Sequence, residues 1–228
     1  MTIIEIVDQL ERLAVEAGEP EAVGSQAGAT AASLRRLVET GAGWPQDLLE
    51  LLAHRDGGEF GSLRVFSTAD HLEEVEQVQA ARDAFRDNGR DDDVLPVAEW
   101  LANPGYYYFD TTGAALGDDE GPGYCLDDAG ELTRFASLAE ILTAEIDQLR
   151  VRGVMKSADR VAAFERFAMT QSVEQTLSLA LILATRPRDA RELDALRTAV
   201  VARWASLPSE HAGASERLAK ALGIPLGA

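Results

Sequence analysis

The stretch that decides the fold runs from Trp44 to Phe66 and reads WPQDLLELLAHRDGGEFGSLRVF. Proline suits the first turn of a helix, and the leucines at positions 48, 49, 51 and 52 give that helix one broad apolar face. Gly57 and Gly58 can adopt the backbone conformations that end a helix without a steric penalty. Residues 63 to 66, LRVF, then alternate as a half-buried strand does. The stretch therefore predicts a helix, a turn and the first strand of a sheet.

The regions on either side of this stretch alternate between helical and extended patterns. Residues 2 to 17 have helical periodicity, and Thr2 and Glu5 have the spacing of a capping box. A polar link follows at 18 to 30, and then a second helix at 31 to 39. Further along, residues 68 to 87 look helical, and residues 95 to 100 and 106 to 110 should pair as antiparallel strands through the turn at 103 to 105. The aromatic run at 106 to 109 should place one side-chain pair in the core and leave the other exposed, unless helices cover both faces of the sheet.

The last third of the chain is rich in alanine, leucine and arginine at helical spacing. Ser157 and Ser172 are candidate N-caps, and Pro187 and Pro208 mark boundaries. The predicted helices are 137 to 152, 157 to 168, 170 to 184, 188 to 206 and 213 to 222. The fold class expected from all these patterns is α+β, with a mostly antiparallel sheet flanked by helices and a C-terminal all-helical extension. We expect an N-terminal helix and linker at 1–29, the α+β domain at 30–145 and the extension at 146–228.

Charge is distributed unevenly along the 228 residues, whose net charge is −18. Residues 1–145 carry 30 acidic and nine basic residues, whereas residues 146–228 carry nine acidic and twelve basic ones. An acidic surface repels nucleic-acid phosphates and anionic lipid head groups, so neither nucleic acid nor a membrane is an expected partner. A basic protein would instead be attracted and steered. Solubility alone is an equally good explanation of the acidity.

The N-terminus and the lack of a long apolar run predict a cytoplasmic protein, and the single cysteine excludes an internal disulfide. Cys125 is the only cysteine, and its place on an apolar strand suits a small core residue better than a nucleophile. The N-terminus lacks the basic region of a secretory signal, and no apolar run is long enough to span a membrane. No phosphate-binding loop, zinc-protease motif or nucleophile elbow is present, so we expect no cofactor, no metal site and no catalysis.

The sequences of several segments resemble those of the SUKH superfamily, the Smi/Knr-like proteins that include a yeast cell-wall synthesis regulator. Trp44-Pro45 with Asp47-Leu48, followed by Asp56-Gly57-Gly58, resembles the family's opening. The later matches lie at 95–98 (LPVA), 103–110 (NPGYYYFD), 123–127 (GYCLD) and 135–142 (FASLAEIL). The resemblance covers about residues 30 to 145 and leaves the helical extension outside. It implies the α+β fold given above and, for bacterial members, an immunity protein that binds and neutralises a cognate toxin such as a nuclease.

Under that interpretation the partner is a basic toxin, and surface acids and exposed tyrosines make the contact. The residues expected to bind it are Glu59, Asp91, Asp92, Asp93, Tyr106, Tyr108, Asp118, Asp119 and Glu120. Two alternatives stay open. The chain could be a regulatory or scaffold protein whose extension binds a partner helix or forms a homodimer. It could also be an enzyme whose site is assembled from unremarkable acids, which a deep pocket with converging titratable groups would reveal.

Overall fold

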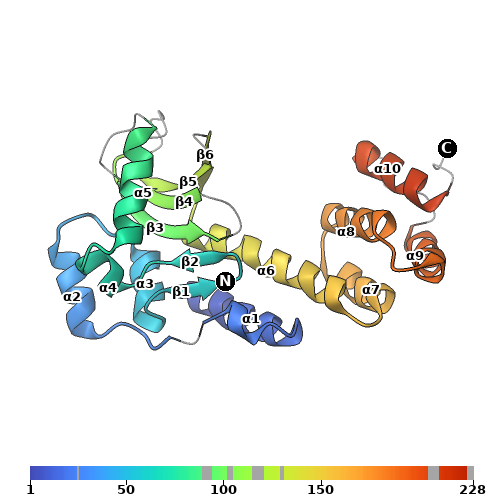
Figure 1. Ribbon diagram of the computed structural model, residues 1–228, viewed down its shortest axis with the longest axis horizontal. Coiled ribbons are helices and arrows are strands. Elements are labelled where there is room, and N and C mark those ends of the chain that lie inside the picture. The colour runs from blue at the N-terminus through green and yellow to red at the C-terminus, as the bar shows by residue number, and fades with distance from the viewer. Residues whose placement is uncertain are drawn as a thin grey trace. The chain divides into compact units, whose positions relative to one another are not determined.

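The computed structural model describes residues 1–24, 26–88, 94–101, 105–114, 121–128, 131–204 and 211–224 (Figure 1). The chain divides into two compact units, Met1–Leu149 and Arg150–Ala228. The first unit contains a six-stranded antiparallel sheet whose strands follow one another in sequence order. The second is helical. The predicted α+β class, with helices in the C-terminal part, is confirmed.

The first unit holds helices on both sides of its sheet. Its helices are α1 (Ile3–Glu16), the 3-10 turn η1 (Pro20–Ala22), α2 (Ala31–Glu39), α3 (Gln46–His54), α4 (Thr68–Leu72), α5 (Glu76–Asp87) and the start of α6 (Leu138–Lys156). Its strands are β1 (Gly58–Phe60), β2 (Leu63–Val65), β3 (Val94–Trp100), β4 (Gly105–Asp110), β5 (Gly123–Asp128) and β6 (Glu131–Phe135). Helix α1 begins with the predicted capping box of Thr2 and Glu5. Its buried side chains belong to the same hydrophobic core as the sheet.

The stretch from Trp44 to Phe66 forms α3 and the hairpin of β1 and β2. Pro45 lies at the N-cap, one position before the helix begins. The sequence pattern missed β1, because this three-residue strand contains Gly58 and carries no alternation of its own. Gly57 has a φ of 75°, and a Cβ placed on it would lie 2.7 Å from the backbone nitrogen of Ser67. The close approach of the β2–α4 connection therefore requires glycine here.

The two faces of the sheet are covered by different helices, and the strand register shows on which face each side chain lies. Directly opposed residues of antiparallel strands point to the same side. Face A carries Phe60, Leu63, Tyr107 and Tyr124, which belong to the large core together with buried side chains of α1, α3 and α6. Face B carries Val94, Tyr108 and Cys125, which form a smaller core with Ala81 and Phe85 of α5.

Two details of the first unit differ from the sequence-based expectation, and a third decides between two alternatives that the sequence left open. The helical pattern at 68–87 is two helices, because Glu74 between them adopts a φ of 47°, outside the helical range. Strand β6 precedes the closing helix where no strand was expected, and its burial alternates only weakly. Tyr107 and Tyr108 are both buried, one on each face, so the alternative in which helices cover both faces holds for this pair.

The second unit consists of the end of α6, then α7 (Arg160–Thr170), α8 (Val173–Thr185), α9 (Ala190–Arg203) and α10 (Ala212–Leu222) around a separate apolar core. Ser172 caps α8 in a capping box with Gln175, as its position predicted. Ser157 does not cap α7, because Asp159 accepts the hydrogen bond from the amide of Ala162 instead.

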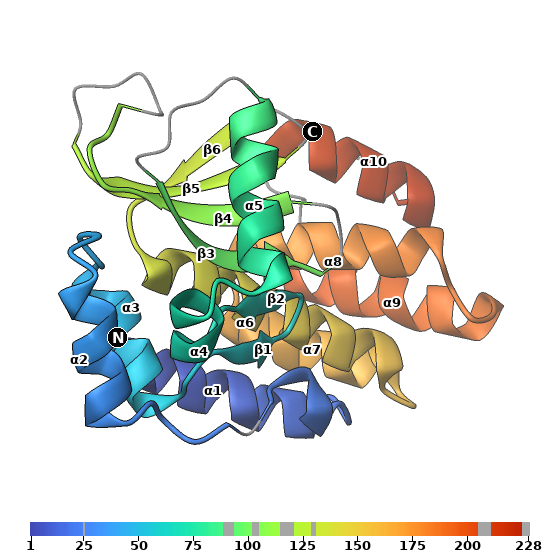
Figure 2. The same ribbon diagram turned by 60° about the vertical axis from the view of Figure 1, so that its left-hand side comes forward.

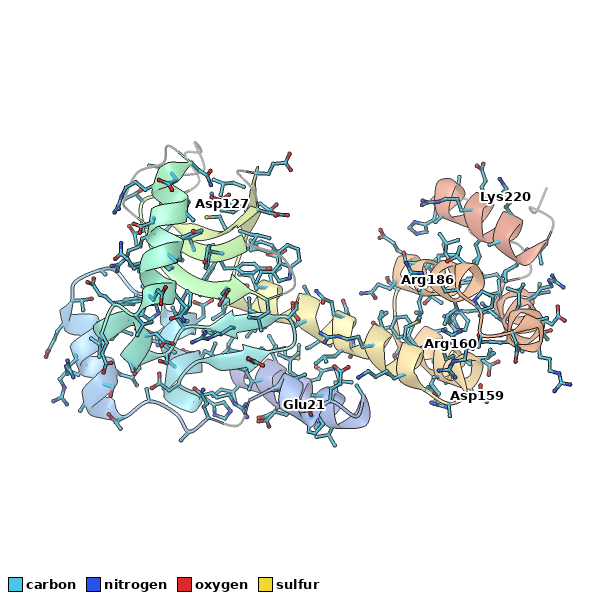
Figure 3. All side chains as sticks on the ribbon, in the orientation of Figure 1. Glu21, Asp127, Asp159, Arg160, Arg186 and Lys220 are labelled. Carbon is cyan, nitrogen blue, oxygen red and sulfur yellow. The ribbon has the colours of Figure 1, made fainter. Side chains whose placement is uncertain are left out.

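A buried ion pair joins α7 to α9 within the second unit. The guanidinium of Arg160 donates to both carboxylate oxygens of Glu192 and to the backbone carbonyl of Arg186 (Figure 3). The hydrogen bond from Arg160 holds the pKa of Glu192 below its usual value. This pair fixes the connection between α8 and α9 against the start of α7. Among the residues described in both units, no helix is long and apolar enough to cross a membrane.

Candidate functional site

Two acids of the stretch from Trp44 to Phe66 accept hydrogen bonds within the fold and are therefore not available to a ligand. Asp47 accepts hydrogen bonds from the Tyr124 hydroxyl at 2.5 Å and from the amide of Leu138, the first residue of α6, at 3.0 Å. Burial raises the pKa of Tyr124, and the nearby carboxylate of Asp47 raises it further. Asp56 accepts from both the amide and the hydroxyl of Thr68 at the start of α4. Each acid therefore ties a helix N-terminus to α3 or to the turn that follows it.

A third acid of the first unit is also occupied within the fold. Glu145 of α6 is only 3% exposed, and its carboxylate accepts hydrogen bonds from the amide and the hydroxyl of Ser62 at 2.7 and 2.8 Å. Ser62 lies in the turn between β1 and β2, so this contact anchors the tip of the hairpin to α6. The neighbouring Tyr107 has its pKa raised to about 12, mainly by burial and also by the charge of Glu145.

Helix α5 covers only part of face B. It crosses in front of the strands in both Figure 1 and Figure 2. Phe85 packs on Tyr108 with their ring centroids 4.6 Å apart, and the Tyr108 hydroxyl donates to the carbonyl of Ala81 at 2.7 Å. Tyr108 is completely buried. The expectation that Tyr108 is an exposed contact residue is therefore wrong, because α5 lies over it.

The rest of face B presents a row of polar side chains that runs across four strands. Glu59 of β1 opposes Arg64 of β2, Arg64 opposes Glu99 of β3, and Glu99 opposes Tyr106 of β4. We call these four residues the polar row. Glu59 is exposed and the other three are half-buried. Since neighbouring strands lie about 4.8 Å apart, successive members of the row are one strand spacing apart.

No hydrogen bond or ion pair joins the side chains of the polar row to one another. Arg64 forms no hydrogen bond or ion pair with any residue that the structure describes, although acids stand opposite it on both sides. Burial raises the pKa of Tyr106, and the charge of Glu99 raises it further, so the hydroxyl stays protonated at neutral pH and can donate a hydrogen bond. On the far side of Tyr106 stands Asp127 of β5, which Figure 3 labels. Asp127 accepts a hydrogen bond from the side-chain amide of Asn88 at 2.9 Å, and this contact joins the end of α5 to the sheet.

The structure brings together two of the residues that the sequence analysis predicted to bind the partner, Glu59 and Tyr106. It adds two that were missed, Arg64 and Glu99. The alternation of residues 63 to 66 places Arg64 opposite in direction to the buried Leu63 and Val65, and that signal could have found it. Its pairing with Glu99 depends on the register. Asp91, Asp92 and Asp93 lie outside the described residues, as do Asp118, Asp119 and Glu120.

Other groupings of chemical groups in the described part of the chain are few. No cluster of three or more histidine, cysteine or acidic residues suited to a metal ion occurs there. A hollow of about 280 Å³ lies beside α5 and is lined by Arg82, Phe85, Arg86, Val94 and Leu95. Within it, Arg82 pairs with Glu74 and Arg86 pairs with Asp83. The two arginines of this hollow are thus already paired with acids of α5 and of the connection that precedes it.

The chain was compared with protein-family models, with curated protein sequences and with solved structures. None of the three comparisons found a match.

Proposed function

We propose that this chain is a non-catalytic protein-binding module, and that it is an immunity protein that binds and neutralises a basic toxin such as a nuclease. The observation that carries the proposal is the polar row. It places Glu59, Glu99 and Tyr106 in line on face B, where Glu59 is exposed and the other two are half-buried. The resemblance of residues 30 to 145 to the SUKH superfamily supports the same function.

Charge supports the proposal over a longer range. The first unit, residues 1–149, carries 31 acidic and nine basic residues. A surface of one sign raises the rate at which a partner of the opposite sign is encountered, and this effect weakens as salt screens it. A nuclease binds its substrate through a basic channel, so an acidic protein surface can occupy that channel in place of the phosphates. Inhibition then requires only binding, and no chemistry.

The first test is capture of partners from a lysate of the source organism with the purified full chain, at low and at moderate salt. A basic protein whose enzymatic activity falls when the chain is added supports the proposal. Association of that protein should then be followed by stopped-flow for the double reversal Glu59→Lys with Glu99→Lys. The matched control is Glu39→Lys with Glu73→Lys, which changes the net charge equally at exposed acids outside the polar row.

We expect the reversal in the polar row to slow association about tenfold more than the control does, because it places two repulsive charges in the contact itself. Equal rates for the two variants would show that only net charge matters and would remove the polar row from the interface. A captured protein that is not basic, or whose activity is unchanged, would contradict the immunity role.

A second candidate function, a regulatory or scaffold role through the helical unit, is favoured by one observation. Met169 of α7 and Val201 of α9 are 81% and 51% exposed, although both are large apolar residues. Light scattering after size exclusion of the full chain and of Met169→Lys with Val201→Lys tests this role. A dimer that the double substitution dissociates would favour self-association, and a monomer in both samples would argue against it.

A further inference from the structure

The polar row has a spacing and a charge order that specify the partner more closely than acidity alone does. Resting on the proposed binding function, we infer that the partner presents a helix to the polar row. This helix lies alongside α5 and carries a basic, an acidic and a basic residue on successive turns. The basic residues face Glu59 and Glu99, and the acidic residue faces Arg64.

The spacing follows from the geometry of the sheet. Glu59, Arg64 and Glu99 stand on three adjacent strands, so neighbours in the row are about 4.8 Å apart. Residues three or four positions apart on a helix face the same side, and one helical turn rises about 5.4 Å. A helix that crosses the strands therefore meets each member of the row with one turn. An extended strand, with about 6.8 Å between side chains on one face, loses this register within two residues.

The charge order follows from Arg64. This guanidinium has no partner among the described residues and stands between two acids. A wholly basic surface would place a cation against it, and desolvating an unpaired guanidinium on binding is unfavourable. A carboxylate in the middle position removes that penalty, since arginine and carboxylate form charge-assisted hydrogen bonds. The site thus selects an alternating pattern and rejects a uniform one.

Helix α5 shows how a helix fits this sheet. It crosses face B with Phe85 seated on Tyr108, and Tyr106 lies beside Tyr108 with a ring separation of 6.4 Å. The half-buried ring of Tyr106 therefore forms one flank of the position next to α5. The exposed Leu101, directly after β3, adds an apolar residue at the end of that strand. Such a mixture of one aromatic ring, one apolar residue and charges is typical of protein interfaces.

The test uses two stapled helical peptides of identical composition and the full-length chain. The first peptide, KEK, carries Lys at i, Glu at i+4 and Lys at i+7. The second, EKK, exchanges the first two of these residues, so its net charge is the same. Binding is measured by fluorescence anisotropy near physiological ionic strength, where long-range attraction to the acidic unit is screened. Amide chemical shifts locate the contact on the chain.

We expect the chain to bind KEK about fivefold more tightly than EKK, because the exchange replaces two attractive contacts by two repulsive ones of modest strength. Arg64→Glu should abolish the preference, and Arg35→Glu, an equal charge change on exposed α2, should retain it. Shift changes should centre on the strands of the polar row.

Equal affinities for the two peptides, no binding of either, or a preference that persists in Arg64→Glu would overturn the inference. The proposed function can be judged separately, because it depends on capture of a basic partner by the full chain. A basic partner that the chain inhibits, together with equal binding of KEK and EKK, would leave the immunity role in place and remove the helix register.

Discussion

His71 should make the stability of the first unit sensitive to mild acid. This imidazole is buried on α4, with its ring 4.6 Å from the ring of Trp44 and 5.9 Å from that of Phe66. Neither ring nitrogen has a hydrogen-bond partner among the residues that the structure describes. Burial lowers the pKa of His71 to about 4; the charge of Asp70 partly opposes this shift, and that of Arg82 adds to it.

The direction of the effect follows from the two protonation equilibria. An unfolded chain takes up a proton on this histidine near pH 6.5, whereas the folded chain resists protonation down to about pH 4. Between these values the unfolded state binds more protons, so the contribution of His71 to stability is complete above pH 6.5 and is lost as the pH falls. The loss amounts to about 2 kcal/mol at pH 5 and about 3 kcal/mol at pH 4.

The assay compares the chain with His71→Phe, which keeps a ring among Trp44 and Phe66 and cannot be protonated. Both are studied in a Trp204→Phe background, so that the fluorescence comes from Trp44 and Trp100 in the first unit. Urea unfolding at pH 7.5, 6 and 5 gives the free energy of unfolding of each protein. Their difference isolates His71 from the many carboxylates that titrate in the same range.

We expect the free energy of unfolding of the parent chain to fall by about 2 kcal/mol relative to His71→Phe between pH 7.5 and pH 5. His54→Gln serves as the control, because His54 is partly exposed at the end of α3 and is not enclosed by aromatic rings. A constant difference between the parent and His71→Phe across this range would refute the reasoning, as would an equal effect of His54→Gln.

Three further substitutions test how the sequence specifies the fold. Asp47→Ala should destabilise the first unit by about 3 kcal/mol, because it leaves the buried hydroxyl of Tyr124 and the first amide of α6 without an acceptor; the shift of the urea midpoint measures this. Gly57→Ala should cost more than about 2 kcal/mol, and Gly41→Ala about 1 kcal/mol, since both have positive φ but only Gly57 meets backbone atoms; thermal unfolding that ranks them equally would contradict the steric argument. Ser172→Ala should cost about 1 kcal/mol through loss of the cap of α8, and amide exchange should show faster opening in the second unit than in the first.

Local signals were sufficient for most of the helices. The capping residues Thr2 and Ser172 start α1 and α8 in the structure as their positions predicted, because a cap acts on amides only two or three residues away. Such a local signal was misleading at α7, where two candidate capping residues lie close together in the sequence. Asp159 took the capping role expected of Ser157, because α7 begins at Arg160 and Asp159 is the residue directly before it.

Local sequence patterns were less successful in predicting the strands of the sheet. β1 and β6 escaped notice because they are short strands at the two edges of the sheet, and only their pairing with β2 and β5 makes them part of it. The fate of the tyrosines was equally non-local. Alternation correctly separates Tyr106 and Tyr108 from Tyr107, but only the path of α5 decides that Tyr108 is covered and Tyr106 stays half-exposed.

The sequence by itself determined the α+β class, most helix positions and the acidity of the first unit, because each follows from neighbouring residues or from simple composition. The tertiary structure alone decided that Glu59, Arg64, Glu99 and Tyr106 form one row. Four strands spread over almost fifty residues contribute to it, and a shift of any one register by a single residue would turn its side chain to the other face. Such a row is set by the pairing of the strands and by the packing of the face A core, which no local pattern encodes.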